Sequence, residues 1–467
     1  WAQRSNLNAI EQGELPKQII HRISEDLLQS YAQTPLLSKY DIYQILMDYW
    51  AEQMQDDVYV LAQDGWAAGK MLRELVAKKG EKLKETPDLI INKVKYKAEL
   101  IPPGLIIARY FASEQAEIDL GDDPMGNPMN IPLHIIHGSE RGPTLAVTAA
   151  IHGNEMNGTG IIHQLAFGSD HQEGTTDDHI DPEAMSGTLI LVPVVNVEGM
   201  LLQDRNAPDG RDINRLFPGK KDGNQSQRLA HTLFDLVVRR ADYLIDLHTA
   251  PNTRMNVPHV RANLDNTTCK KLARAFGTEV ILHSNGPEGS IRRTATDAGI
   301  PAILLESGTS NRFEPDSLEC GVRGILNVMA KLGMLEGKLV KPRWRILVRR
   351  FRWIRAPEGG LLHTLIDGGA SVKKGETIAH ITDPFGSSVV SITSPVTGYV
   401  VGLATTPLVR PGDPIANVVI VREKKLQEII EKDTQAGLKP REHVEEVEED
   451  EVEDEGGSTL DETEGQG

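Results

Sequence analysis

The sequence predicts an α/β fold: a mixed, doubly wound sheet, preceded by a helical N-terminal segment and followed by a small all-β module. Three observations support this prediction. Residues 120–338 alternate short apolar, partly β-branched runs with helix-like patterns, as a sheet with helices on both faces requires. Residues 1–119 show apolar residues at helical spacing, and residues 339–422 show short strand patterns separated by glycine- and proline-rich turns. Residues 423–467 are a charged, helix-like stretch and an acidic tail of disordered type.

The N-terminal segment is predicted to contain two helices. Apolar residues recur at helical spacing in Leu36–Met54 and Met71–Leu83, and Asp41 can cap the first helix. In residues 120–338 the patterns predict strands at 131–137, 144–151, 187–196, 243–247, 279–282 and 301–305, and helices at 157–167, 226–240, 266–276 and 317–333.

The predicted all-β module also resembles a known kind of domain. Gly368–Ile381 resembles the hammerhead of biotinyl and lipoyl carriers. A carrier presents a lysine at a hairpin tip, and the corresponding turn, Thr382–Gly386, has none. We therefore expect a structural or site-shielding role for this module rather than a swinging arm.

Net charge supports neither a nucleic-acid partner nor a membrane partner. The formal charge is −17, but residues 442–467 contain thirteen acidic residues and no Lys or Arg, which leaves −4 for the rest of the chain. No basic surface for nucleic acid or for a membrane follows from this balance. We therefore expect neither partner, and the oligomeric state stays open.

The cysteine count and the hydropathy pattern indicate a cytoplasmic protein. Cys269 and Cys320 are the two cysteines, too few for a disulfide framework, and they are expected to be reduced thiols. No uninterrupted apolar segment approaches the roughly 20 residues of a membrane span. No signal peptide is visible after Trp1.

A histidine and a carboxylate mark the first candidate site. His152 and Glu155 follow the predicted strand 144–151, at the strand end where α/β proteins place their sites. Imidazole nitrogen and carboxylate oxygen bind Zn²⁺ at similar distances. A further ligand is expected at another strand end, and His248 closes the apolar run 243–247. Each histidine alone is an ordinary polar residue, whereas two in matching contexts indicate a metal site.

Four motifs occur in an order typical of one enzyme family: His152-Gly-Asn-Glu155, Asp212-Ile-Asn214-Arg215, Asp246-Leu-His248-Thr249 and Leu304-Leu-Glu306-Ser-Gly308. From about Pro132 to Val421 the chain resembles the succinylglutamate desuccinylase/aspartoacylase family, zinc deacylases on the metallocarboxypeptidase fold. The resemblance implies a sheet of the zinc-carboxypeptidase type and one Zn²⁺ per chain.

The resemblance also assigns roles to these residues. It implies that His152, Glu155 and His248 hold the zinc, which keeps a fourth position for the attacking water. Glu306 matches the family's general base, and Arg205 matches the arginine that steadies the oxyanion.

Three further residues match the substrate-binding part of the family's motifs. Asn214 and Arg215 match the pair that fixes the substrate's carboxylate, a task that suits a planar guanidinium. Asp212 matches the carboxylate that orients the first zinc histidine. For any one of these arginines, a surface salt bridge is the alternative interpretation.

These assignments predict a zinc-dependent deacylase that cleaves the amide bond of small N-acylated amino acid derivatives. Two alternatives stay open. One is a metallocarboxypeptidase that acts on peptides, on the same fold. The other is a non-catalytic component of a DNA-modification complex.

The second alternative rests on the N-terminal segment. Lys39–Ala51, Met54–Asp57 and Leu100–Phe111 resemble part of the modification subunit of type I restriction systems. Such a methylase needs a glycine-rich cofactor loop and an Asn-Pro-Pro-aromatic motif for the flipped adenine, and the sequence contains neither. We therefore expect no methyltransferase activity. A docking module, the remnant of a gene fusion and a misjoined reading frame all agree with the sequence.

Overall fold

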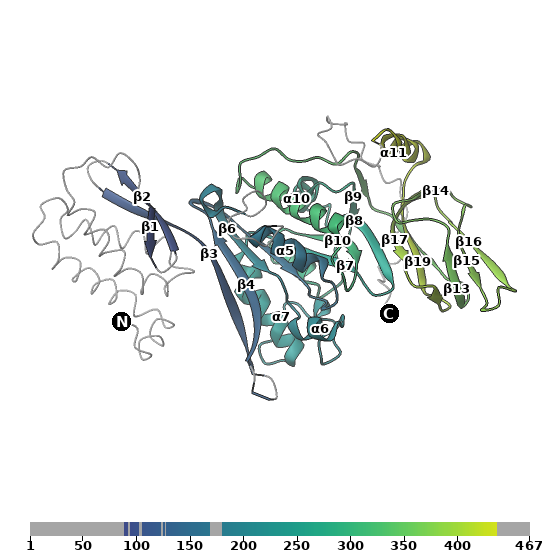
Figure 1. The fold of residues 1–467 in the computed structure, drawn as a ribbon, viewed down its shortest axis with the longest axis horizontal. Helices are drawn as coiled ribbons and strands as arrows, with labels where there is room; N and C mark the ends of the chain where they lie inside the picture. The colour runs from purple at the N-terminus through teal and green to yellow at the C-terminus, as the bar shows by residue number, and fades with distance from the viewer. Residues whose placement is uncertain are drawn as a thin grey trace, which may run out of the picture. The chain divides into compact units, whose positions relative to one another are not determined.

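The computed structural model describes residues 88–91, 94–101, 105–122, 125–126, 128–168 and 180–436 (Figure 1). The chain divides into two units, residues 1–112 and 113–467. The predicted helices Leu36–Met54 and Met71–Leu83 lie outside the described residues, as do Lys39–Ala51 and Met54–Asp57.

The described part of the N-terminal segment is made of strands. β1 (Asp88–Ile91), β2 (Val94–Ile101) and β3 (Leu105–Asp122) pair as antiparallel neighbours. The prediction of a helical segment is therefore wrong for residues 88–119 where they are described. The sequence of β2 does carry the pattern of a strand, because its charged and apolar residues alternate with a period of two.

The central sheet of the second unit is mixed. The pairs β6–β5, β5–β7 and β7–β10 are parallel, whereas β4 pairs antiparallel with β6 and β8 pairs antiparallel with β10. β9 extends the sheet beside β8, and β11 pairs with β9. In spatial order the strands are β4 (Pro128–His137), β6 (Ser186–Val192), β5 (Glu140–Ala149), β7 (Tyr243–Ala250), β10 (Ala302–Thr309), β8 (Arg254–Ala262), β9 (Val280–His283) and β11 (Ile346–Val348).

Helices cover both faces of this sheet. Because successive strand residues point to opposite faces, Leu145 and Val147 of β5 join a core with α5, α8 and α10, whereas Ala146 joins a core with α7 and α9. The sheet is therefore doubly wound, as predicted. The helices are α5 (Asn157–Phe167), α6 (Val197–Leu202), α7 (Gln225–Leu236), α8 (Thr267–Phe276), α9 (Ile291–Asp297), α10 (Pro315–Lys331) and α11 (Glu423–Ala436), with 3₁₀ turns at Pro182–Ala184, Ile213–Arg215 and Val238–Arg240.

The predicted strands and helices of the second unit are confirmed, with end shifts of a few residues, but three elements were missed. α6 and α9 are shorter than a periodic pattern can reveal. β8 contains Pro258 and several polar residues, which weaken a strand pattern. The strand that the sequence did not predict turns out to carry several side chains of the candidate site.

A β-rich part follows the sheet. Its strands form a core of their own, and one set pairs in the order β16, β15, β13, β18. β17 pairs with the first half of β8, with Asn256 opposite Gly402, whereas the second half of β8 pairs with β9. β8 therefore joins the two parts. The strands are β12 (Phe351–Arg355), β13 (Gly360–Thr364), β14 (Ser371–Val372), β15 (Thr377–Thr382), β16 (Val389–Thr393), β17 (Gly398–Ala404), β18 (Leu408–Val409) and β19 (Pro414–Ile420).

None of the helices among the described residues combines the length and the apolar character that a membrane-spanning segment needs.

Candidate metal centre

A tight turn between β5 and α5 carries His152 and Glu155. The backbone N–H of Glu155 donates to the carbonyl oxygen of His152 at 3.0 Å. Gly153 lies against α6, and a Cβ at this position would come within 2.0 Å of a backbone carbon of Gly199. Glycine is therefore required between the two side chains, because the backbone of another element occupies the space of any side chain.

His248 lies near the C-terminal end of β7, beside β10. In the parallel register of these two strands, His248 is the partner of Glu306. Neighbouring residues in register project from the same face of a sheet. The ends of three strands, β5, β7 and β10, therefore bring the predicted residues to one edge of the sheet, as expected for an α/β protein.

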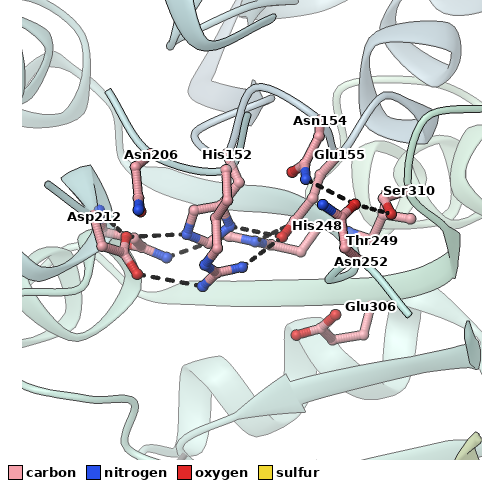
Figure 2. A network of polar contacts seen from close by, with 12 residues as sticks. His152, Asn154, Glu155, Asn206, Asp212, His248, Thr249, Asn252, Glu306 and Ser310 are labelled. Atoms are coloured by element: carbon pink, nitrogen blue, oxygen red, sulfur yellow. Dashed lines mark hydrogen bonds and ion pairs between the residues drawn. The ribbon is translucent and has the colours of Figure 1, made fainter. Parts of the chain in front are cut away.

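The three predicted ligands form a compact, buried group (Figure 2). Nδ1 of His152 lies 2.8 Å from Oε1 of Glu155, and Nδ1 of His248 lies 2.9 Å from Oε2. One ligand atom from each residue lies within 4.8 Å of the other two. The exposed fractions of His152, Glu155 and His248 are 3%, 1% and 5%. Two imidazoles and a carboxylate at these separations are able to share one metal ion.

The far nitrogens of both histidines contact aspartates. Nε2 of His152 lies 3.0 Å from Oδ1 of Asp212, and Nε2 of His248 lies 2.8 Å from Oδ2 of Asp246. Asp246 also accepts a hydrogen bond from Thr148. Carboxylates in this position hold the imidazole of a metal ligand in one orientation and one tautomer. Each Nδ1 is thereby directed toward Glu155.

One polar atom of the group lacks a hydrogen bond. Nδ1 of His152 is buried and makes none with any described residue, although Oε1 of Glu155 is near, because the geometry is unsuitable. Buried polar atoms are nearly always satisfied, and exceptions require an explanation. A metal ion bound between the imidazoles and Glu155 would satisfy this nitrogen.

Electrostatics couples the group in its metal-free form. Burial alone would raise the pKa of Glu155, but the charges of His152 and His248 outweigh burial and lower it well below its usual value. Burial alone would lower the pKa of His248, but Asp246 and Glu155 raise it well above its ordinary value.

Arg205 bridges two carboxylates of the site. Its Nη1 donates to Oε1 of Glu155 at 2.9 Å, and its Nη2 donates to Oδ2 of Asp212 at 3.3 Å. The pKa of Asp212 is lowered despite its burial, first by the hydrogen bond with His152 and then by the charges around it. Arg205 therefore lies directly at the predicted ligand group.

Asn214 and Arg215 lie on the 3₁₀ turn Ile213–Arg215, which Asp212 caps. Nδ2 of Asn214 lies 3.3 Å from Nε2 of His248, and its Oδ1 accepts a hydrogen bond from the backbone of Ile291. The guanidinium of Arg215 contacts the carbonyl oxygen of Asn214 and lies 3.7 Å from Asp212. The structure thus places Asn214 beside His248 and Arg215 beside Asp212, the carboxylate that contacts His152.

Glu306 projects from β10 and makes no direct bond to the three ligands (Figure 2). Its Oε2 accepts a hydrogen bond from Asn256 at 2.8 Å, and its Oε1 lies 3.9 Å from Nε of Arg261. The side chain is 15% exposed. Asn256 and Arg261 both come from β8, so the unpredicted strand holds the predicted base.

A network of amides supports the turn from the other side. Nδ2 of Asn154 donates to Oδ1 of Asn252 at 3.0 Å, and Ser310 donates to the same oxygen at 2.9 Å (Figure 2). The backbone N–H of Thr249 donates to Oε2 of Glu155. The loops after β5, β7 and β10 are thereby tied to one another.

Several residues have contacts at the site that the sequence did not predict. Asp246 lies two residues before His248 in a quoted motif, and this spacing was a usable signal. Asn256, His259 and Arg261 lie on β8, whose pattern gave no strand, so no signal pointed to them.

Comparisons with known proteins relate this chain to one enzyme family. Residues 141–332 match the family model described as the succinylglutamate desuccinylase/aspartoacylase catalytic domain. An N-alpha-acetyl-L-2,4-diaminobutyric acid deacetylase from Halomonas elongata is 25% identical over 283 residues, which cover 58% of this chain and 79% of that protein.

Two solved structures show the same fold. A succinylglutamate desuccinylase/aspartoacylase from Rhodobacter sphaeroides is 27% identical, with a TM-score of 0.58, and the match covers 67% of this chain and 96% of that one. The product-bound ectoine utilization protein EutE (DoeB) from Ruegeria pomeroyi is 25% identical, with a TM-score of 0.58, and covers 66% and 95%. The mixed α/β sheet and the β-rich C-terminal part are therefore shared with these proteins.

Proposed function

Because residues 141–332 belong to the succinylglutamate desuccinylase/aspartoacylase catalytic-domain family, we propose that the protein is a zinc-dependent deacylase. Its substrate would be a small N-acylated amino acid derivative, and its products a carboxylic acid and an amine. The observation that carries the proposal is the buried group of His152, Glu155 and His248, with one ligand atom from each within 4.8 Å of the others.

The donor set fits zinc. Two imidazole nitrogens and one carboxylate oxygen are a common ligand set of catalytic zinc sites, which keep an open fourth position. The aspartates behind the histidines and the unsatisfied Nδ1 of His152 fit the same ion. Bound zinc would supply a Lewis acid that polarises the acyl carbonyl and lowers the pKa of water.

The chain's own side chains would then carry the proton and hold the substrate. Glu306 is the general base: it would take a proton from water and pass it to the leaving amine. Asn256 fixes the Glu306 carboxylate by its hydrogen bond. Arg205 would steady the developing negative charge on the acyl oxygen.

The substrate's amino acid carboxylate would be held by Asn214 and Arg215. Asn214 lies next to His248 and Arg215 lies next to Asp212, and a planar guanidinium binds a carboxylate through two parallel hydrogen bonds.

A metal analysis combined with a substrate panel tests the proposal. We expect one zinc ion per chain and hydrolysis of N-acetyl or N-succinyl amino acids, N-acetyldiaminobutyrate included. Activity should vanish with a chelator and return with zinc. Short peptides with a free carboxyl terminus are the control, because faster cleavage of peptides would favour a metallocarboxypeptidase. Purified protein that retains DNA and contains no zinc would contradict the proposal.

A further inference from the structure

Residues 338–355 form a strongly basic stretch that follows α10 and includes β11 and β12. The stretch contains eight Lys and Arg residues and no Asp or Glu. The charge of −4 that remains for residues 1–441 conceals this local excess. A local excess of one sign of charge produces a potential at the surface even where the net charge is small. The stretch is therefore a candidate surface for an anionic partner.

Contacts with α8 and α10 fix the first part of this stretch. Nδ2 of Asn327, on α10, donates to the carbonyl oxygen of Val340 at 2.9 Å, and the backbone N–H of Val340 donates to Oδ1 of Asn327 at 2.8 Å. A Cβ at Gly277, the C-cap residue of α8, would lie 3.0 Å from the same carbonyl oxygen. Lys338 and Lys341, on either side of Val340, are exposed. A fixed segment of backbone therefore presents both lysines to solvent.

Three arginines extend this positive charge. Arg343 and Arg345 follow the two lysines, and Arg274 lies in the last turn of α8. Burial and the charge of Arg274 lower the pKa of Arg345 to about 10, whereas Glu279 raises it. Two guanidinium groups thus lie close enough to repel each other, and a bound anion would reduce this repulsion. The basic surface is defined here as Arg274, Lys338, Lys341, Arg343 and Arg345.

α11 ends close to this basic surface. It packs on the apolar core that contains Trp344 (Figure 1), and Nε1 of Trp344 donates to Oδ1 of Asp433 at 2.8 Å. α11 ends at Ala436, less than one helical turn after Asp433. Because Trp344 stands between Arg343 and Arg345 in the sequence, the end of α11 lies near two arginines of the basic surface.

The sequence after α11 carries the opposite charge. Residues 442–467, the acidic segment, contain thirteen acidic residues and no Lys or Arg, and residues 437–441 link them to α11. A segment joined to its binding site by a short link has an effective concentration on the order of millimolar. Single exposed ion pairs contribute only about 0–1 kcal/mol each, but many pairs and a tether act together. The acidic segment is therefore favoured over a polyanion that is free in solution.

We propose that the acidic segment binds the basic surface of the same chain. Its carboxylates would pair with the guanidinium groups of Arg343 and Arg345 and reduce the repulsion between Arg345 and Arg274. Bound in this way, the segment keeps other polyanions off the surface. The inference is independent of the proposed function, because no residue of the basic surface belongs to the candidate metal centre.

Cross-linking with a carbodiimide tests the contact, since this reagent joins an amine to a carboxylate only where the two touch. In the full-length protein at about 0.01 M salt, we expect Lys338 and Lys341 to be joined to the acidic segment. Most of these cross-links should be lost at about 1 M salt, where charges are screened within roughly 3 Å. Lys220 and Lys221, which are also exposed, are the controls. Equal cross-linking of all four lysines would overturn the inference, as would cross-links between labelled and unlabelled chains in a mixture.

Retention on heparin gives a second test. An amide variant, in which the nine acidic residues of 445–455 become Gln or Asn, should elute at higher salt than wild type. Adding Lys338→Gln and Lys341→Gln should abolish this gain, whereas adding Lys220→Gln and Lys221→Gln should preserve most of it. The last two proteins have the same net charge, so a difference between them reports on the location of the charge. Identical elution of these two proteins would contradict the proposed contact.

Discussion

Each predicted histidine ligand uses its two ring nitrogens for different tasks. Nδ1 faces Glu155, and Nε2 contacts an aspartate, Asp212 for His152 and Asp246 for His248. The imidazoles are therefore oriented before any metal arrives, and a preorganised donor set loses less conformational entropy on binding. Glu306 is separate from this group, and Asn256 holds it.

Replacing Glu306 by Gln tests this separation of roles. The change keeps the shape of the side chain and removes its basicity, so kcat should fall by about 10²–10⁴, the range for general acid–base catalysis. Zinc content, measured on the same preparation, should equal that of wild type. Glu319→Gln is the control, because Glu319 forms a surface ion pair with Arg323. Loss of zinc from Glu306→Gln would show that Glu306 is a ligand.

His259 gives the fold a specific sensitivity to acid. It is fully buried, and burial together with the charge of Arg261 lowers its pKa from 6.5 to about 3. Below pH 6.5, His259 therefore binds a proton in the unfolded chain but not in the folded chain. The stability that His259 contributes above its unfolded-state pKa of 6.5 is lost as the pH falls toward its folded-state pKa of about 3.

Unfolding by urea at about pH 7 and pH 5 measures this contribution. At 1.36 kcal/mol per unit, wild type should lose about 2 kcal/mol from His259 over this range. Glutamine does not titrate, so between these two pH values the free energy of unfolding of His259→Gln should fall by about 2 kcal/mol less than that of wild type. This comparison holds whatever the absolute stability of the variant. The same difference between the two pH values in both proteins would mean that His259 is not the source.

At the scale of elements, the site depends on contacts between strand ends and one short helix. The turn after β5 lies against α6, and the side chain of Asn196 caps α6 by accepting from the backbone of Gly199. β8 supplies Asn256 and Arg261 to Glu306. The geometry of the site is therefore set by packing between elements as much as by the motifs themselves.

Gly153→Ala should disturb the site through this packing. The new Cβ would lie 2.0 Å from the backbone of Gly199, so one of the two elements must move, at a cost of about 1–3 kcal/mol or more. We expect a lower melting temperature and weaker zinc retention in a competition with a chelator. Gly359→Ala is the control, because its nearest atom would lie at 3.3 Å. Unchanged zinc retention in Gly153→Ala would contradict this account of the turn.

At the scale of the whole chain, the boundary between its two units lies within a strand. β3 runs from Leu105 to Asp122, and the units divide after residue 112. Ile118, on the later half of β3, is 6% exposed and belongs to the core shared with α7 and α9. The second unit therefore begins before residue 120, where the composition of the sequence placed its start.

Two truncations distinguish these boundaries. A chain that begins at Ser113 keeps Ile118 and should retain hydrolysis and thermal stability. A chain that begins at residue 120 loses it and should be less stable by about 1.5–3 kcal/mol, the value of one buried aliphatic side chain. The melting temperatures and kcat/KM of the two chains show whether the second unit begins at residue 113 or at residue 120. An inactive, folded chain that begins at Ser113 would show that residues 1–112 contribute to catalysis.

The sequence by itself determined the elements whose patterns are local. The apolar runs that end at His152, His248 and Glu306 gave the parallel strands, and the motif order gave the family. The alternation in β2 is readable in the sequence too, although the helical spacing earlier in residues 1–119 predicts a helical segment. These features depend on periodicity and on neighbours in the chain, which a sequence displays directly.

Only the tertiary structure decided how the site is completed. Asp246 turned out to hold His248, and β8 brought Asn256, Arg261 and Arg254 to Glu306. The contacts of β8 with Glu306 join residues about 50 positions apart, on a strand whose proline and polar residues hide its pattern. The pairing of β8 with both β10 and β17 is a property of the folded sheet, because such a register is fixed by packing on both faces and not by any single stretch of sequence.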